Sequence, residues 1–400
     1  MTGETGRVPG TIPVSRRDFA KIAIAAAVAP TLPAGWPAPA AAGLVPPEPV
    51  RVAPAWPGYE RAIVIDALAS PGPFNVPERT ARPLSAAMLA NARASGITAV
   101  NVTVNTGGAD AHGSFVATVR ELGYWARELA AHPETLVQVR SAADVREAKR
   151  SGRLGLVFGF QDADLLESDV ARLGVFHDFG VRVIQLTYNL RNPLGDGCLQ
   201  KDNAGLTSFG REVVGRMNEL GLLVDLSHCG QRTTAEAITA SAAPVAITHT
   251  GCDALYPHPR NKRDAELRAM ADRGGVVGIY MMPFLNAEGP AQIDDFLEHL
   301  EHAIRVCGED HVGVGSDNSI TPTVADDTYR RTLRAFADER ARLGIGAPRE
   351  HEVLFVEGLN EPRRMETLAD RLLERGHTET RVEKVLGGNW LRLWTDVWRA

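Results

Sequence analysis

Residues 222–228 read LLVDLSH and residues 245–249 read VAITH. Each stretch is short and almost continuously apolar, which is typical of a parallel strand that is buried on both faces. Each also ends in a histidine, His228 or His249. Six further runs of the same kind recur along the chain, at residues 62–66, 98–104, 154–161, 181–188, 276–281 and 312–317. The pattern therefore predicts eight strands.

Amphipathic stretches rich in Ala, Leu and Arg separate these runs, for example at residues 114–131, 209–220 and 291–306. Eight strands that alternate with helices predict an α/β fold, a (β/α)8 TIM barrel. A doubly wound open sheet is the alternative, and the absence of a GxGxxG turn after the first strand weakens it. Residues from Asp326 onward are expected to be wholly helical and to pack around the outside of the barrel.

Composition bounds the possible functions. The 400 residues are 44% hydrophobic and 23% charged, which excludes global disorder. With 43 basic and 49 acidic residues the formal charge is -6, whereas nucleic-acid binders usually carry a basic surplus. We therefore expect no nucleic-acid partner. No run of 18 apolar residues is present, so we expect no membrane span. Four cysteines are too few for a disulfide scaffold, and their pairing stays open.

The first 42 residues are predicted to be an export signal. Residues 15–21 read SRRDFAK, which matches the twin-arginine pattern, and an apolar stretch and small residues suited to cleavage follow. The alternative is a disordered Ala/Pro tail with a chance arginine pair. On the first interpretation the twin-arginine translocation machinery is a partner, and the mature protein is periplasmic or secreted. Residues 43–58 are then a Pro-rich linker, and residues 59–400 form the barrel.

Polar side chains stand at the ends of the predicted strands. The carboxyl ends of barrel strands meet at one face, where barrel enzymes place their chemistry. Two histidines that end consecutive buried strands, with Asp317 ending the eighth, are therefore interpreted as a site rather than as separate structural residues. The end residues are Asp66, Asn105, Gln161, Tyr188, His228, His249, Tyr280 and Asp317.

At these positions the sequence resembles the membrane (renal) dipeptidase family, which are zinc hydrolases on an amidohydrolase-type barrel. The resemblance covers about residues 60–398. The blocks that carry it are GLTSFG at 205–210, MNELG at 217–221, DLSH at 225–228, THT at 248–250, RN at 260–261, VGSD at 314–317, EGL at 357–359 and VLGGNWLR at 385–392.

The resemblance implies roles for particular residues. His228 and His249 correspond to the two histidine ligands of one zinc ion, whose bound water has a lowered pKa. Asp317 corresponds to the carboxylate that takes a proton from that water and passes it to the leaving amine. Arg260 corresponds to an arginine that binds the α-carboxylate of the substrate, although an ordinary loop charge is the alternative. A homodimer is also implied.

The sequence departs from the family at the other metal ligands. The family's first strand ends in Asp-Gly-His-Asn-Asp, whose His and second Asp bind the second zinc. Residues 66–70 here read DALAS, so Leu68 and Ser70 occupy those places. The bridging Glu of the third strand aligns with Gln161, a neutral amide that is at best a weak ligand. The family's Leu-Thr-His becomes Leu-Thr-Tyr at Tyr188, which retains a hydrogen-bond donor for substrate.

Three of five expected ligands are changed, so the sequence predicts one zinc ion or none. A mononuclear site would draw on His228, His249 and one of Gln161, Asp317 or Asp162. Two other kinds of ligand are conceivable but are assigned structural roles, namely the thiols of Cys229 and Cys252 and the loop residue His258.

Two functions follow. The first is an exported hydrolase, related to dipeptidases, that cleaves a small amide or dipeptide with at most one metal ion. The second is a catalytically silent relative that retains the fold for a binding or scaffolding role. Joint retention of His228, His249 and Asp317 favours the first, and loss of the bridging carboxylate favours the second.

Overall fold

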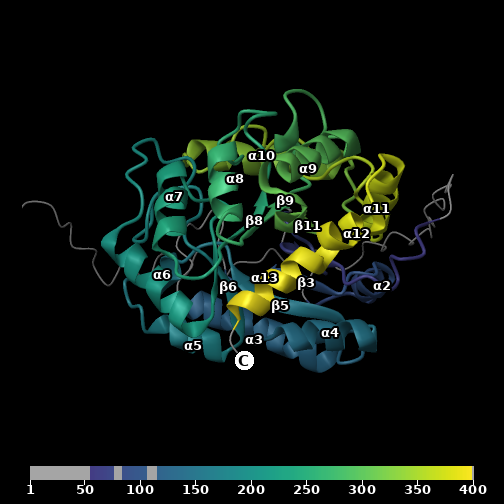
Figure 1. The fold of residues 1–400 in the computed structure, drawn as a ribbon, viewed down its shortest axis with the longest axis horizontal. Helices are drawn as coiled ribbons and strands as arrows, with labels where there is room; N and C mark the ends of the chain where they lie inside the picture. The colour runs from purple at the N-terminus through teal and green to yellow at the C-terminus, as the bar shows by residue number, and fades with distance from the viewer. Residues whose placement is uncertain (1–54, 76–82, 106–114, 399–400) are drawn as a thin grey trace, which may run out of the picture. The chain divides into compact units, whose positions relative to one another are not determined.

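The short β-branched runs form the strands of a parallel barrel. The computed structural model describes residues 55–75, 83–105 and 115–398. Eight strands follow one another in chain order around the sheet, and every neighbouring pair is parallel (Figure 1). They are β1 (Ile65–Asp66), β3 (Ala99–Thr103), β5 (Leu154–Phe160), β6 (Val181–Gln185), β7 (Leu223–Asp225), β8 (Ala246–Thr250), β9 (Val276–Ile279) and β10 (Val312–Val314).

The sheet closes on itself between its first and last strands. The Ala67 amide donates to the Val314 carbonyl oxygen at 3.0 Å, and the Asp317 amide donates to the Leu68 carbonyl oxygen at 2.8 Å. Just beyond, β2 (Ala69–Ser70) pairs in parallel with β11 (Asn318–Ser319). These contacts leave no open edge between β1 and β10. The predicted TIM barrel is therefore confirmed, and the open doubly wound sheet is excluded.

One additional strand lies beside β5. Residues Leu136–Gln138 form β4, which pairs in parallel with the first half of β5. Strand β6 pairs only with the second half of β5, from Phe158 onward. The short strand β4 therefore covers a part of β5 that β6 leaves unpaired.

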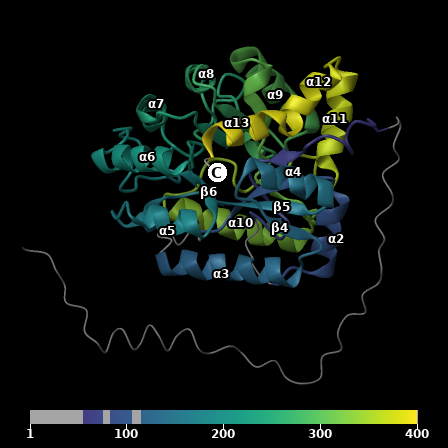
Figure 2. The same ribbon diagram turned by 60° about the horizontal axis from the view of Figure 1, so that its bottom comes forward.

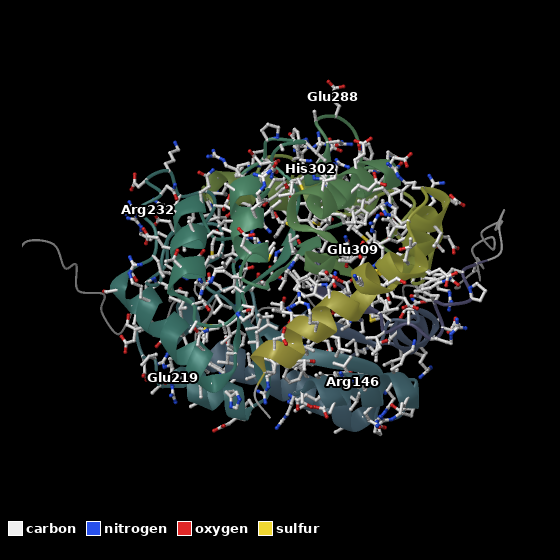
Figure 3. The ribbon with its side chains drawn as sticks, in the orientation of Figure 1. Arg146, Glu219, Arg232, Glu288, His302 and Glu309 are labelled. Atoms are coloured by element: carbon white, nitrogen blue, oxygen red, sulfur yellow. The ribbon has the colours of Figure 1, made fainter. Side chains whose placement is uncertain are left out.

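Helices alternate with the strands and surround them. They are α2 (Ala86–Ala94), α3 (Phe115–Ala131), α4 (Ala142–Ser151), α5 (Arg172–Asp178), α6 (Ser208–Leu220), α7 (Gln231–Ala240), α8 (Asp264–Ala271) and α9 (Ile293–Cys307). Local sequence fixes their ends. The Thr207 hydroxyl accepts the Gly210 amide at the start of α6, and Gly221 ends that helix with φ 69°, a left-handed value that favours glycine. Exposed charges such as Arg146, Glu219 and Arg232 lie on the outside of this ring (Figure 3).

The C-terminal region is only partly helical. Helix α10 (Asp327–Arg342) is followed by a long segment with little helix, and α11 (Arg364–Glu374) and α12 (Glu379–Glu383) come after it. The expectation of an unbroken helical region from Asp326 is therefore wrong. Gly344, Gly346 and Pro348 explain the interruption, because glycine and proline end helices.

The last helix, α13 (Asn389–Val397), closes one end of the barrel instead of packing around its outside. Its Trp390 and Trp394 side chains belong to one buried cluster with Ile65, Ala99, Val157, Val183, Leu223, Ala246 and Val276. Each of those seven residues comes from a different strand, so the cluster is the barrel interior. Figure 1 shows α13 crossing in front of the strands, and Figure 2 shows it on the side of β6 opposite to α10. The expectation for α13 is thus also corrected.

Some sequence-based predictions fall on residues that the structure does not describe. The export signal at residues 1–42 and most of the linker at 43–58 lie outside the described ranges. Near the end of that linker, the Trp56 amide donates to Asp370 Oδ1 at 2.8 Å, and the Trp56 side chain is buried. Within residues 55–75, 83–105 and 115–398, no helix combines the length and the apolar character needed to cross a membrane.

Candidate functional site

Three aromatic or imidazole rings meet where β6, β7 and β8 end. The Tyr188 and His228 rings stack with their centroids 4.1 Å apart and an interplanar angle of 22°. The His228 and His249 rings meet edge to face, with centroids 5.0 Å apart. The structure therefore brings these three sequence-predicted site residues together at the carboxyl end of the barrel.

A hydrogen bond fixes the tautomer of His228. The Asn189 Nδ2 group donates to the Ile345 carbonyl oxygen at 2.9 Å, so Asn189 turns its Oδ1 toward the ring. His228 Nδ1 lies 2.7 Å from that oxygen and must carry the proton, because Oδ1 can only accept. The Nε2 atom is left with its lone pair. It is buried and has no hydrogen-bond partner among the residues that the structure describes.

A similar chain of contacts fixes His249. The buried Asp225 carboxylate accepts the Thr248 hydroxyl proton at 2.6 Å, so Thr248 Oγ1 is free to accept a second hydrogen bond. His249 Nδ1, 2.9 Å away, donates to it. His249 Nε2 therefore carries a lone pair as well, and within the described part of the chain it too is buried without a partner. Residues that hold the second nitrogen of an imidazole in this way are typical of ligating or catalytic histidines.

Both imidazoles are neutral at physiological pH. Burial is the main cause, and it lowers the pKa of His228 and of His249 well below the ordinary value. The positive charges of Arg260 and Lys262 lower both pKa values further. The pair therefore presents two hydrogen-bond acceptors in a positively charged environment.

Arg260 reaches the same region from the loop after β8. It is only 3% exposed, and its Nη1 donates to the Ser227 carbonyl oxygen at 2.8 Å. Its Nη2 is buried and has no hydrogen-bond partner in the described ranges. A buried guanidinium donor without a partner is costly, so a ligand atom that accepts a hydrogen bond is the expected partner.

Asp317 is held at the end of β10 in an unusual backbone conformation. Its φ is 59°, in the left-handed region that only a few percent of non-glycine residues adopt. The glycine two residues earlier allows close packing there, because a Cβ on Gly315 would lie 1.8 Å from the Thr248 carbonyl oxygen. Burial raises the pKa of Asp317 to about 7, and Arg260 partly opposes that shift. The positive charge of Arg260 therefore acts on the Asp317 carboxyl group.

Two predicted metal ligands, Gln161 and Asp162, each make hydrogen bonds to other residues through one of their side-chain atoms. Gln161 Nε2 donates to Thr103 Oγ1 at 2.8 Å, on the neighbouring strand. Asp162 Oδ1 accepts from Asn192 Nδ2 at 2.8 Å and from the Asp164 amide at 3.0 Å. These contacts give Asp162 a role in shaping the loop.

The thiols and His258 make structural contacts. Cys229 is buried and accepts the Thr187 hydroxyl at 3.4 Å. The Cys252 amide donates to His299 Nδ1 at 2.8 Å. The His258 ring stacks on Phe284, with centroids 4.5 Å apart, and its Nε2 donates to the Pro348 carbonyl oxygen at 3.0 Å.

The comparisons with known proteins identify the family of the chain. The family model of the membrane dipeptidases, peptidase family M19, matches residues 76–333 and 341–400. The chain belongs to the membrane dipeptidase family. The sequence resemblance predicted this membership.

The chain is also similar to individual proteins. Dipeptidase tcpJ of Claviceps purpurea is 27% identical over 290 residues, which cover 72% of this chain and 61% of that protein. The uncharacterized dipeptidase C965.12 of Schizosaccharomyces pombe is 35% identical over 176 residues, 42% of each chain. The matches thus span less than two thirds of both curated relatives. The crystal structure of an amidohydrolase from Pseudomonas aeruginosa is 33% identical, with a TM-score of 0.73 and coverage of 85% of this chain and 98% of that one.

The residues of this family member do not fit the paired zinc centre that is usual in membrane dipeptidases. Among the described residues, no three His, Cys, Asp or Glu side chains gather so that they would hold a metal ion. Two imidazole nitrogens alone fall short of the three protein ligands of a catalytic zinc. The charges of Arg260 and Lys262 also oppose a nearby dication.

The first strand shows why the second half of a dipeptidase zinc centre is missing. Leu68 is buried, with 2% of its surface exposed, and offers no ligand atom. Ser70 Oγ accepts the Gly72 amide at 3.2 Å. Asp66 accepts from Arg364 Nη2 at 3.0 Å, and both side chains are buried.

Sequence reasoning missed the residues that orient the two histidines. Asn189, Thr248 and Asp225 were visible only as neighbours of predicted site residues. Only Thr248 stands directly beside a strand-end histidine, whereas Asn189 follows Tyr188 and Asp225 lies three residues before His228. The role of Arg364 could not be predicted from its neighbours in the sequence, because its partner Asp66 lies 298 positions away.

Proposed function

We propose that this member of the membrane dipeptidase family is a hydrolase of small amides or dipeptides that works with at most one bound metal ion. The single observation that carries the proposal is that three buried atoms at the strand ends, His228 Nε2, His249 Nε2 and Arg260 Nη2, have no partner among the described residues. Burial also raises the pKa of Asp317 to about 7. A buried carboxyl group with a raised pKa is suited to general acid–base catalysis.

The proposed mechanism assigns a task to each group. The Arg260 Nη2 group binds the substrate carboxylate and fixes the position of the scissile carbonyl. Ionised Asp317 takes a proton from the attacking water and returns it to the leaving amine. The Nε2 atoms of His228 and His249 accept hydrogen bonds from the water or from the substrate amino group. Tyr188 orients the substrate from the side of β6.

A specific observation favours the second candidate, a silent relative that binds small molecules. The carboxylates expected on the first and third strands are absent, and the nearby charges of Arg260 and Lys262 disfavour a dication. A protein with these features retains groups for binding a small polar ligand while lacking the electrostatic stabilisation that two zinc ions give a transition state.

The experiment combines metal analysis with activity on a panel of dipeptides and small amides. We expect no more than one zinc per chain, and hydrolysis that Asp317→Asn abolishes. Asp338→Asn, which changes an exposed carboxylate of α10, is the matched control and should leave activity intact. Binding of a dipeptide without turnover, with or without zinc, would instead identify the silent relative.

The contribution of the two histidines to metal binding needs its own variants. If one ion binds, His228→Ala or His249→Ala should each lower the zinc content and remove the increase in thermal stability that zinc gives the wild-type protein. The increase should also disappear in chelator. His351→Ala, which changes an exposed histidine, serves as the control. Equal zinc content in all four proteins would exclude a histidine-bound ion.

We further propose that the protein is exported by the twin-arginine route, and the SRRDFAK sequence at residues 15–21 supports this. Replacing both Arg16 and Arg17 with lysine should leave an uncleaved precursor in the cytoplasm. Normal processing of that double variant would contradict the assignment.

A further inference from the structure

Two consecutive residues after β6 connect His228 to a distant segment of the chain. Tyr188 stacks on one face of the His228 ring, and Asn189 accepts its Nδ1 proton. On their other sides, the Tyr188 ring lies 5.9 Å from the guanidinium of Arg340, and Asn189 donates to the Ile345 carbonyl oxygen. We call residues 340–350, which comprise the end of α10 and the loop after it, the strap.

The strap lies across the loops that follow several strands. Besides Asn189 after β6, it contacts the loop after β8, where His258 donates to the Pro348 carbonyl oxygen at 3.0 Å. It also contacts the segment after β9, where Arg349 Nε donates to the Pro283 carbonyl oxygen at 2.9 Å. The strap is therefore seated on the same end of the barrel as the histidine pair.

One buried ion pair holds the strap in its shape. Arg340, only 4% exposed, forms a bidentate pair with Glu350, with Nε–Oε2 and Nη2–Oε1 distances of 2.7 and 3.0 Å. The Arg340 Nη2 group also donates to the Ile345 carbonyl oxygen, and Glu350 accepts the Ala347 amide. The carbonyl group that Asn189 contacts is thus oriented by this pair.

The first part of this arrangement lies outside the family match. The membrane dipeptidase model covers residues up to 333 and again from 341, so the α10 segment that ends in Arg340 is not accounted for by the family pattern. The Arg340–Glu350 pair therefore joins a residue outside the match to one inside it.

We infer that the strap positions His228 by setting its tautomer. Asn189 keeps its Oδ1 toward His228 because its Nδ2 donates to Ile345; an amide turned by 180° would place two oxygens against each other there. Without the strap that constraint is lost, and the turned amide would offer Nδ2 to His228 Nδ1. The imidazole proton would then move to Nε2, and the acceptor that faces the site would become a donor.

Among the residues that the structure describes, one further side chain contacts the Asn189 amide group. The Cys198 thiol donates to Asn189 Oδ1 at 3.5 Å, but a thiol is a weak donor. His249 is held by Thr248 and Asp225, which belong to β7 and β8, and the described contacts of those three side chains do not involve the strap. The strap therefore acts on one histidine of the pair only, and Asn189, Arg340 and Glu350 are positioning residues.

The test is histidine ¹⁵N NMR on the full chain without metal or substrate, which makes it independent of the proposed hydrolysis. In the wild-type protein, both His228 and His249 should show a protonated Nδ1 and an unprotonated Nε2. In Glu350→Ala, His228 should shift toward the Nε2–H form while His249 keeps its signals. Glu339→Ala, which removes an exposed ion pair with Arg342 on the same helix, is the control and should change neither.

A rescue variant distinguishes a specific effect of the strap on the His228 tautomer from a general loss of structure around the site. Asp at position 189 has no donor to offer when ionised, so Asn189→Asp combined with Glu350→Ala should return the proton of His228 to Nδ1. Arg340→Gln breaks the ion pair from its other side and should reproduce the Glu350→Ala result, which covers the case in which Glu350→Ala folds poorly. An unchanged His228 in both strap variants, equal changes in the two histidines, or failure of the rescue would each overturn the inference.

Discussion

The end of the first strand and the ends of β7 and β8 occupy the same end of the barrel but differ in how their polar atoms are used. At the first strand, Asp66 Oδ1 accepts the Ser316 amide at 2.7 Å, and Asp66 Oδ2 accepts Arg364. At β7 and β8, the Nε2 atoms of His228 and His249 are buried without partners in the described structure. The first region has become part of the barrel's closure, and the second retains groups that a ligand would satisfy.

The difference indicates where selection has acted on chemistry rather than on stability. An unsatisfied buried polar group costs about 1–3 kcal/mol, and native proteins keep few of them. A fold under selection for stability alone would pair or replace such atoms, as happened around Leu68 and Ser70. Three unpartnered atoms in one place, His228 Nε2, His249 Nε2 and Arg260 Nη2, therefore mark the candidate ligand site. At the first strand, Arg364 Nε also lacks a partner among the described residues.

The largest effect is expected from a variant that places metal ligands at the end of the first strand, so that this region, like the ends of β7 and β8, could bind a ligand. The variant Leu68→His, Ser70→Asp, Gln161→Glu restores the family's ligand set. In chelator it should lose more than about 5 kcal/mol of unfolding free energy, because two carboxylates are buried without partners. Zinc should restore stability, since all five ligands would converge. Urea unfolding with and without zinc measures both effects.

The structure supplies a control for that experiment. Gln161→Glu alone places one carboxylate beside Thr103 without the two ligands on the first strand, so zinc should restore little of its stability. A triple variant that binds no more zinc than the wild-type protein would mean that these strand ends do not converge on a metal position.

The second prediction breaks the closure itself. Arg364 is 1% exposed, and it donates to Asp66 and to the Ser319 carbonyl oxygen. Arg364→Met should lower the free energy of unfolding by about 3–5 kcal/mol, because a buried carboxylate is left uncompensated. Adding Asp66→Asn should recover part of the loss. Denaturant unfolding of both variants provides the test, and a single variant as stable as wild type would show that the pair does not hold the closure.

The third prediction concerns the pH dependence of the unfolding free energy, to which Asp317 contributes. The pKa of Asp317 rises from its ordinary 3.8 to about 7 in the folded protein, so folding favours the protonated form. The stability that this group contributes is full below about pH 4 and is lost as the pH rises to about 7. Asn does not titrate. The stability of wild type relative to Asp317→Asn should therefore fall across that range by about 2 kcal/mol, within the limit of about 4 that the shift implies.

Unfolding curves at several pH values measure this difference, and Asp338→Asn is again the control because its carboxylate is exposed. A constant difference between wild type and Asp317→Asn from acid to neutral pH would contradict the raised pKa. It would also remove the main support for Asp317 as the proton-transfer group.

Much of the fold was predictable from the sequence, because buried parallel strands leave continuous apolar runs. All eight barrel strands were found in this way. Strand β4 was missed because Leu136–Gln138 contains only two apolar residues, Leu136 and Val137, and so does not form a continuous apolar run. The path of α13 was missed because an amphipathic pattern shows that a helix has a buried face but not which surface covers it.

The site was predictable to the level of strand ends and no further. The positions of His228, His249 and Asp317 followed from the parallel strands, since those ends meet at one face. Their tautomers and charge states did not follow, because they depend on side-chain hydrogen bonds with Asn189 and Thr248. The contacts of the strap could not be predicted for the same reason, since no local pattern in residues 340–350 indicates a contact with Tyr188 or Asn189.

The position of α13 has a consequence for the order in which the chain is made. Trp390 and Trp394 fill the barrel interior beside the first residues of the strands, and the Trp390 indole donates to the Val314 carbonyl oxygen at 3.1 Å. During translation at about 5–20 residues per second, β1 leaves the ribosome tens of seconds before these tryptophans do. For that interval the nascent barrel has an exposed apolar interior that only the last helix covers. The barrel interior is therefore completed only once α13 has left the ribosome, and chaperones that bind apolar segments would have that whole interval in which to act.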